Sequence, residues 1–373
     1  MGFSQSRDNQ ALSHASSTLL DPDPPAAAAT TTPLASSSLP WASSDSTHSA
    51  LSPAAIFNVE GLVAVITGGG TGIGLMMGRA LENNGATVYI IGRRRQVLEA
   101  AAAEHSKFGR IHPLEGDITD RDSLLSLVEK VKAQHGFIDL LVNNAGIARN
   151  LYPHPLPSPN DPASRSHDQH PPSPPASPGP TPQAPSIKAF QNTLWETGSP
   201  QDFADVFATN VTAPYYTTIA FLDLLHQGNI RRQRLSTTAG AAFGFPYQTS
   251  QVLTVSSSGS FRIDAKVLSP SYTLSKIAAT HLGKLLANLL GPWGIRSNVL
   301  APGVWPTEMT TSPTPDFKLD PSVLASTVPL KRTGTVEDMA GTILYLASAA
   351  GAYVNGAVWL VDGGRVGTVA STY

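Results

Sequence analysis

The chain of 373 residues contains no cysteine and little charge. The lack of cysteine excludes a disulfide framework, a thiolate nucleophile and a cysteine-ligated metal site, and we expect no metal. Charged residues make up 14% and the net charge is −2, so a dedicated nucleic-acid binder is not expected. The longest basic tract is Arg93–Arg95. No run of about 18 apolar residues occurs, and we therefore expect no membrane-spanning helix.

Three segments are poor in the residues that build a core. Residues 1–54 are rich in Ser, Ala, Thr and Pro and are interpreted as a disordered tail. They lack the pattern of a secretory signal, so we expect a cytoplasmic protein, although Gly2 and Ser6 fit a short myristoylation pattern. A Pro-rich block at 149–186 and an irregular stretch at 227–249 are interpreted as surface insertions. Non-coding sequence retained in an imperfect gene model is the alternative for these two blocks.

The remaining residues alternate between short apolar runs and amphipathic stretches. The predicted strands are Leu62–Ile66, Thr87–Ile91, Ile111–Leu114, Phe137–Val142, Gln251–Val255, Ile295–Leu300 and Ala357–Val361. The predicted helices are Gly72–Asn84, Arg95–Ser106, Arg121–His135, Ser199–Leu225 with a break near Pro214, Tyr272–Leu290 and Val336–Ala347. This pattern predicts one α/β domain over residues 55–373, with a doubly wound parallel sheet of about seven strands and helices on both faces.

A glycine-rich turn joins the first predicted strand to the first long helix. Its residues are Thr67, Gly68, Gly69, Gly70, Thr71, Gly72, Ile73 and Gly74. Glycines here allow close backbone approach to a pyrophosphate, and the start of the helix offers free N–H groups and positive potential. Because the turn follows a strand and opens a helix, we predict a phosphate site rather than an ordinary tight turn.

The second predicted strand ends without the acidic residue that commonly holds a free ribose 2′-hydroxyl. Gly92 stands at that place, and Arg93 and Arg94 follow. A guanidinium there suits a 2′-phosphate, which favours NADP(H) over NAD(H). The alternative is that these arginines are solvated cations at the start of a helix.

Polar residues also follow the third and fourth strands. Asp117 and Ile118 come after the third strand, where the carboxylate either contacts the adenine or caps the helix beginning near Arg121. After the fourth strand, Asn143, Asn144, Ala145 and Gly146 suit a tight turn beside a ligand.

Tyr272 and Lys276 lie four residues apart and therefore on one face of a predicted helix. A nearby ammonium group would lower the pKa of the phenol, which could then exchange protons with a carbonyl or alcohol oxygen. Two serine-containing segments could supply a hydroxyl beside Tyr272: Ser256–Ser258, and the similar segment Ser236–Gly240. We prefer the former because an apolar strand precedes it.

Taken in order, these motifs resemble the short-chain dehydrogenase/reductase family over about residues 55–365, apart from the insertions. The matching pieces are Thr67–Gly74, Asp117, Asn143–Gly146, Asn210, the serine strand, Tyr272–Lys276, Pro302-Gly303 and Val361–Gly364. The resemblance implies a Rossmann fold and hydride transfer between NADP(H) and a carbonyl or alcohol. It also implies the simple reductase branch of that family.

The resemblance also implies roles for single residues. Tyr272 would be the acid/base, Lys276 would lower its pKa and hold the nicotinamide ribose, and Ser257 would bind the carbonyl oxygen with Ser258 as the alternative. Asn210 would hold a relay water, Asn144 would lie near the cofactor, and Thr307 after Pro302-Gly303 would meet the carboxamide.

Two other functions are also compatible with these motifs. One is a non-catalytic dinucleotide-binding protein, and the other is an epimerase or dehydratase that uses the same tyrosine.

The segment Val304–Val328 is expected to cover the substrate. Its residues Trp305, Met309 and Phe317 favour an apolar ketone from secondary metabolism, such as a polyketide or terpenoid intermediate. The helices Asn210–Leu225 and Tyr272–Leu290 carry more apolar surface than one sheet face needs, and the family resemblance implies that they form a homodimer or homotetramer.

Overall fold

A computed structural model describes residues 51–153, 156–158, 186–238, 248–264, 269–311 and 321–373. The chain divides into two units, Met1–Ser44 and Asp45–Tyr373, and all described residues belong to the second. Gly2 and Ser6, with nearly all of the expected tail and most of the Pro-rich block, lie outside the described residues.

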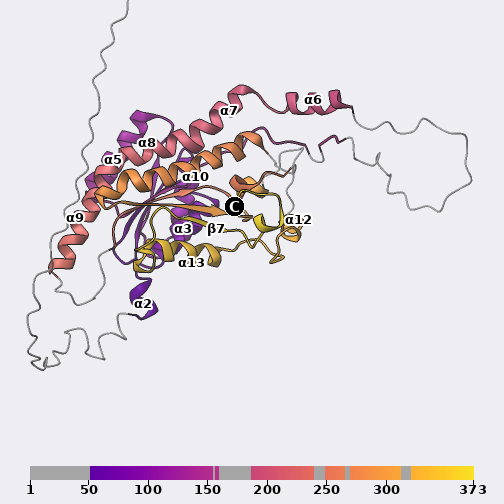
Figure 1. The fold of residues 1–373 in the computed structure, drawn as a ribbon. Helices are drawn as coiled ribbons and strands as arrows, with labels where there is room; N and C mark the ends of the chain where they lie inside the picture. The colour runs from indigo at the N-terminus through magenta and orange to yellow at the C-terminus, as the bar shows by residue number, and fades with distance from the viewer. Residues whose placement is uncertain (1–50, 154–155, 159–185, 239–247, 265–268, 312–320) are drawn as a thin grey trace, which may run out of the picture. The chain divides into compact units, whose positions relative to one another are not determined.

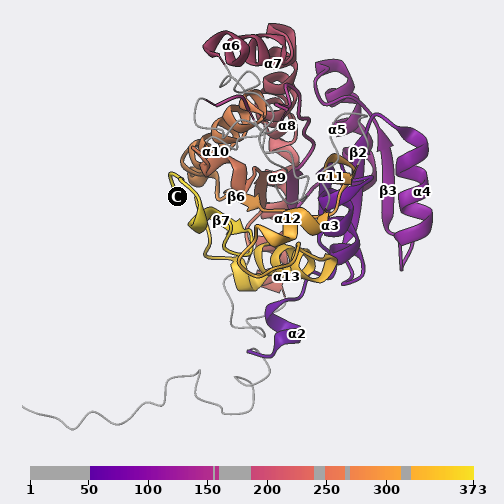
Figure 2. The same cartoon turned by 90° about the vertical axis from the view of Figure 1, so that its right-hand side faces the viewer.

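Seven parallel strands form the sheet, in the order β3-β2-β1-β4-β5-β6-β7. Their bounds are β1 Val63–Thr67, β2 Thr87–Gly92, β3 Ile111–Glu115, β4 Leu140–Asn143, β5 Gln251–Val255, β6 Arg296–Pro302 and β7 Val358–Val361. Figure 2 shows β3 and β7 at the two edges of this sheet. The predicted seven-stranded doubly wound sheet is confirmed.

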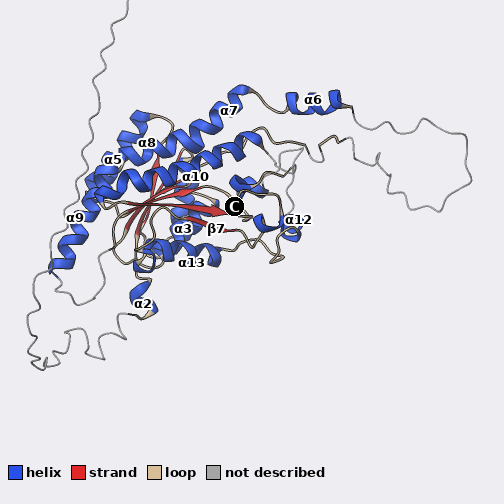
Figure 3. Ribbon diagram, viewed as in Figure 1, coloured by secondary structure: helices blue, strands red, loops and turns tan. Residues whose placement is uncertain are grey.

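Helices cover both faces of the sheet (Figure 3). Alternate residues of each central strand point to opposite faces, so Ala64 and Ile66 join one buried cluster while Val63 and Val65 join the other. The first cluster packs against α3 (Gly72–Glu82), α4 (Arg95–His105) and α13 (Val336–Ala347). The second packs against α5 (Arg121–His135), α8 (Ala213–Ala220), α9 (Leu222–Thr238) and α10 (Pro270–Leu290) (Figure 1).

Short elements complete the description. They are the helices α2 Pro53–Ile56, α6 Ile187–Glu196, α7 Pro200–Phe207, α11 Glu308–Thr311 and α12 Pro321–Ser326, and the turns η1 Ala208–Thr212, η2 Ser258–Phe261, η3 Gly291–Trp293, η4 Ala349–Gly351 and η5 Val366–Thr368. Helix α2 begins at Pro53, with Ser52 accepting a hydrogen bond from the Ala55 amide. The expected tail therefore extends two residues too far, because Ser-Pro is also a helix start.

The long helix predicted over Ser199–Leu225 is interrupted just before Pro214. Residues Ala208–Thr212 form a π-helical turn between α7 and α8. Proline has no N–H to donate to the carbonyl of Asn210, so the regular hydrogen-bond ladder cannot continue through this point. The wider turn places Asn210 in the interior, with 1% of its surface exposed.

The stretch 227–249 is not irregular throughout, since α9 continues to Thr238. Arg232 Nε on this extension lies 2.6 Å from Asp139 Oδ1, and the Asp139 side chain is only 2% exposed. Asp139 Oδ2 also accepts a hydrogen bond of 2.9 Å from the Val63 amide. A polar helical extension has no clear apolar stripe, so periodicity missed it, and an ion pair attaches it to the body. Residues 239–247 lie outside the described residues.

Candidate functional site

A cavity of about 450 Å³ opens at the carboxyl ends of the strands. Residues that follow β1, β2, β3, β4, β5 and β6 all line it, as a doubly wound sheet predicts. Most predicted site residues are among them: Gly68, Gly70, Thr71, Gly72, Ile73, Arg93, Arg94, Asp117, Ile118, Asn144, Ala145, Gly146, Ser257, Tyr272, Lys276, Pro302, Gly303 and Thr307. Three further predicted residues do not line the cavity but contact residues that do: Thr67, Gly74 and Asn210.

The glycine turn forms a tight cradle at one end of the cavity. Gly68 has φ +64°, a left-handed backbone that favours glycine. A Cβ at Gly74 would collide with the Gly68 carbonyl and lie 2.5 Å from Asn144 Nδ2. Thr71 precedes α3 without a side-chain cap, which leaves the first N–H groups of α3 for a ligand. The residues present therefore fit a pyrophosphate.

Asn144 and Thr67 attach the cradle to β4. Asn144 Nδ2 donates hydrogen bonds to the carbonyls of Thr67, at 2.9 Å, and Gly68, at 3.1 Å. Thr67 Oγ1 in turn accepts from the amides of Asn144 and Ala145, at 3.0 and 3.1 Å. These bonds fix the shape of the turn.

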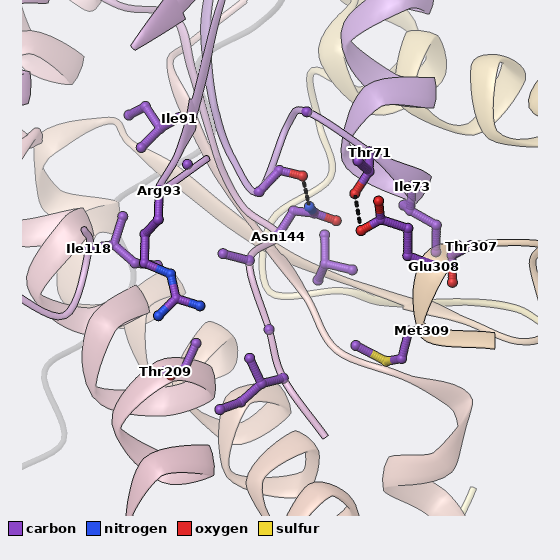
Figure 4. A pocket seen from close by; sticks show the side chains of 18 of the residues that line it. Thr71, Ile73, Ile91, Arg93, Ile118, Asn144, Thr209, Thr307, Glu308 and Met309 are labelled. Atoms are coloured by element: carbon purple, nitrogen blue, oxygen red, sulfur yellow. Dashed lines mark hydrogen bonds between the residues drawn. The ribbon is translucent and has the colours of Figure 1, made fainter. Parts of the chain in front are cut away.

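Arg93 and Arg94 have different surroundings. Arg93 lies beside Ile118 (Figure 4) and contributes to lowering the pKa of Asp117. Arg94 instead forms an ion pair of 2.8 Å with Glu308, which also accepts a hydrogen bond from Thr71. The Arg94–Glu308 pair crosses the cavity, from the loop after β2 to α11.

Asp117 lines the cavity and does not cap the following helix. The cap of α5 is Asp120, whose side chain accepts from the Ser123 amide at 2.7 Å. Partial burial opposes ionisation of Asp117, but hydrogen bonds from Thr119 and the charge of Arg93 outweigh it and lower the pKa of this carboxyl. The capping alternative for Asp117 was thus wrong.

Ser257, Tyr272 and Lys276 line the same cavity. Ser257 and Tyr272 share a side-chain hydrogen bond. Lys276 Nζ donates to the Val255 carbonyl at 2.8 Å and lies 5.6 Å from the centre of the Tyr272 ring. Ser258 is buried in η2 and does not line the cavity, while Ser236–Thr238 belong to α9. The serine that lies beside Tyr272 therefore comes from the segment after β5.

Burial dominates the electrostatics of this group. It raises the pKa of the Tyr272 phenol, and the hydrogen bond with Ser257 acts in the lowering direction. It also lowers the pKa of Lys276 to about 8. The lowering of the Tyr272 pKa that we expected from Lys276 stays a prediction, since burial and the hydrogen bond with Ser257 are the two influences on this phenol.

Asn210 connects this group to the loop after β4. Its Oδ1 accepts from the Ile147 amide at 2.9 Å, and its Nδ2 donates to the Ile147 carbonyl at 3.0 Å and to Ser275 Oγ at 2.9 Å. A Cβ at Gly146 would come within 3.2 Å of Asn210 Oδ1 and 3.3 Å of Lys276 Nζ. Gly146 therefore leaves room for these two side chains to approach one another.

Several cavity residues were not predicted as site residues. Thr209, Glu308 and Thr310 line the cavity, as do Trp305 and Met309 from the expected substrate cover. Trp305 is 3% exposed and donates to the Thr335 carbonyl at 3.0 Å, so it belongs to the wall rather than to a mobile cover. Phe317 lies outside the described residues. No local sequence signal marks Glu308, because its partners are distant in the chain.

The described residues contain neither a candidate metal site nor a helix suited to cross a membrane. The described residues contain no group of three or more His, Asp or Glu side chains arranged to hold a metal ion. Among these same residues, no helix combines the length and the apolar character needed to cross a membrane.

Comparison with known proteins agrees with this geometry. Residues 62–160 match the short chain dehydrogenase family and residues 184–365 match the family described as Enoyl-(Acyl carrier protein) reductase. The chain is 43% identical to the short-chain dehydrogenase/reductase VdtF of Byssochlamys spectabilis, over 87% of this chain and 99% of that protein. The chain therefore belongs to the short-chain dehydrogenase/reductase family, a family of oxidoreductases.

Two solved structures show the same fold. The RhlG/NADP active-site complex of Pseudomonas aeruginosa has a TM-score of 0.62 at 24% identity and covers 83% of this chain and 98% of its own. A 3-ketoacyl-(acyl-carrier-protein) reductase of Brucella melitensis complexed with NADH has a TM-score of 0.61 at 22% identity. The match covers 83% of this chain and 99% of the reductase chain.

Proposed function

We propose that this protein is an NADP(H)-dependent oxidoreductase that reduces a ketone, or oxidises the matching secondary alcohol, with Tyr272 as the acid/base. One observation carries the proposal: a single cavity is lined both by the glycine turn that fits a pyrophosphate and by the Ser257–Tyr272–Lys276 group. The membership of the chain in an oxidoreductase family supports it further.

The protein residues supply a position and a proton. A bound nicotinamide nucleotide would supply the hydride for the carbonyl carbon. Ser257 donates a hydrogen bond to the carbonyl oxygen, and Tyr272 delivers a proton to that oxygen as negative charge develops on it. A raised pKa keeps the phenol protonated at neutral pH, which suits the reductive direction.

The neighbouring groups support this step. Lys276 holds the nicotinamide ribose, Thr307 meets the carboxamide, and Asn144 fixes the glycine turn. Asp117 contacts the adenine, and Asn210 holds the relay water. Trp305, Met309 and Ile147 give the cavity apolar walls, which favours an apolar ketone.

The test is an NADPH-oxidation screen of the full chain over a panel of apolar and polar ketones. We expect turnover with members of the apolar set. NADPH binding without turnover of any ketone would favour a non-catalytic binding protein, and product formation without net NADPH consumption would favour an epimerase or dehydratase. Either result would overturn the proposal.

The cofactor preference gives a specific prediction about Arg93. We expect NADPH to bind at least about tenfold more tightly than NADH, since a guanidinium pairs with a 2′-phosphate and has no matching charge on NADH. Arg93→Ala should remove most of this difference by weakening NADPH alone. Arg94→Ala is the matched control with a smaller effect, because Arg94 is already paired with Glu308. Titration of both nucleotides measures this; equal constants in the unmodified protein would remove Arg93 from this role.

An oligomer is proposed through α10. Four apolar side chains of this helix are 42–54% exposed: Leu274, Ile277, Leu285 and Leu289. They follow helical spacing and thus form a stripe that a second copy could cover. We expect light scattering to show a dimer or tetramer, and Leu285→Glu to shift it toward the monomer. Tyr353→Glu, at a fully exposed position outside this stripe, should leave the mass unchanged.

A further inference from the structure

Asn150 has an unusual backbone for a buried residue. It is one of two non-glycine residues with positive φ in the part of the chain that the structure describes, at +51°, and it is 8% exposed. This conformation is unfavourable for residues with a Cβ, although asparagine tolerates it better than most. Such a residue persists only where its surroundings hold it in place.

The Asn150 side chain contacts two other segments. Its Oδ1 accepts a hydrogen bond of 2.7 Å from Ser271 Oγ, at the start of α10. Its Nδ2 donates a bond of 3.2 Å to the carbonyl of Thr197, just before α7. Gly198 packs so closely on this amide that a Cβ there would collide with Asn150 Nδ2. One side chain thus joins the loop after β4 to the beginnings of α7 and α10.

The bond to Ser271 acts at the turn that carries Tyr272. Ser269 caps α10 by accepting from the Tyr272 amide at 3.1 Å, and its hydroxyl donates to the Arg149 carbonyl at 2.5 Å. Arg149 and Asn150 therefore hold the first turn of α10. The second turn is held separately, by the contacts of Ser275 with Asn210 and of Lys276 with the Val255 carbonyl.

We propose that Asn150 is a positioning residue for the reaction: it fastens the first turn of α10, and with it Tyr272, to the loop after β4. It also fixes the place where the chain returns from the Pro-rich block, because Thr197 lies on the far side of that block. The inference rests on the proposed function of Tyr272, but the fastening itself is a property of the fold.

Three substitutions test the contact in different ways. Asn150→Gly keeps the left-handed backbone accessible and removes both side-chain bonds. Ser271→Ala removes the bond between Asn150 and α10 and keeps the bond to Thr197; it also removes the contacts of this hydroxyl with Ser269 Oγ at 3.2 Å and the Arg149 carbonyl at 3.4 Å. Gly198→Ala keeps the Asn150 side chain but disturbs the contact from the α7 side, because the added methyl group collides with Asn150 Nδ2 and alanine disfavours the φ of +78° at this position. The matched control is Asn229→Ala: Asn229 is also buried and bonds Trp293, Gly294 and Ser250.

Two measurements are made on each variant. Amide hydrogen exchange over residues 269–276 reports the first turns of α10, and kcat is compared with the dissociation constant of NADPH. We expect faster exchange in this segment and a kcat lower by about tenfold or more, because small displacements of an acid/base group are costly. The NADPH constant should change by less than about twofold, since neither Asn150 nor Ser271 lines the cavity. Asn229→Ala should change neither the exchange of this segment nor kcat.

Unchanged exchange over 269–276 together with unmodified kcat in Asn150→Gly and Ser271→Ala would overturn the inference. So would an equal change of both quantities in Asn229→Ala, which would indicate a general loss of stability. If the unmodified protein reduces no ketone, the proposed function fails, and the exchange measurement alone then decides whether Asn150 fastens α10.

Discussion

Replacing Tyr272 with phenylalanine is expected to lower kcat by about 10² to 10⁴ and to leave NADPH binding nearly unchanged. The substitution removes one hydroxyl, and with it the proton that the carbonyl oxygen needs and the hydrogen bond with Ser257. The ring remains to fill its place beside Lys276, and the residues of the glycine cradle are unchanged. Single-turnover NADPH oxidation and a fluorescence titration with NADPH measure the two quantities separately.

Tyr345→Phe is the matched control for this experiment. Tyr345 lies on α13, where its ring stacks on Trp359 at 5.0 Å. Loss of that hydroxyl should leave turnover as it was. A Tyr272→Phe protein that kept its full kcat would place the proton donor elsewhere and would remove the central residue of the proposed mechanism.

Lys276→Met is expected to stabilise the folded protein at neutral pH while it lowers turnover. Burial lowers the pKa of Lys276 from 10.5 to about 8, a difference that corresponds to about 3 kcal/mol against the charged form. Methionine removes this penalty but also loses the hydrogen bond from the charged amine to the Val255 carbonyl, which contributes about 2 kcal/mol. We therefore expect the free energy of unfolding at pH 7 to rise by about 1 kcal/mol.

The pH dependence gives this prediction a definite sign. Between pH 8 and 10.5 the unfolded chain binds the Lys276 proton more tightly than the folded protein does. The contribution of Lys276 to the free energy of unfolding therefore increases with pH across this interval, and below pH 8 the full penalty is present. Denaturant unfolding at several pH values should show this rise in the unmodified protein and its loss in Lys276→Met.

Lys284→Met, at an exposed position of the same helix, is the control and should keep the rise. A Lys276→Met protein that is less stable than the unmodified one at pH 7 would contradict the argument. A gain in stability on removing Lys276 would show that this buried charge lowers the free energy of unfolding, as is common for buried functional charges.

Much of the fold could be predicted because its signals are local. Strand β5 and helices α5 and α13 have the bounds that periodicity and capping residues predict, and the other predicted strands shift by up to three residues. The turn Thr67–Gly74 follows a strand and opens a helix, which is enough to place it at the carboxyl edge of the sheet. The cavity then collects the residues at neighbouring strand ends.

Other parts of the site depend on contacts between distant residues. Arg94 and Glu308 are separated by 214 positions, so nothing near either residue indicates their ion pair. The same holds for Asp139 and Arg232, which attach the polar end of α9. The pKa of Tyr272 depends on how completely the surrounding chain removes water from the phenol, and the residue spacing that identified the Tyr272–Lys276 pair carries no information about hydration.

The attachment of α9 limits how this protein can be shortened. A trimmed version that joined the chain before Arg232 to β5 would leave the carboxylate of Asp139 sequestered without its cation. Uncompensated charge in such a place is strongly unfavourable, and it would act at the amino end of β4, beside the central strand β1. Any smaller derivative made for crystallisation or biocatalysis should therefore retain α9 through Arg232 and begin its deletion after it.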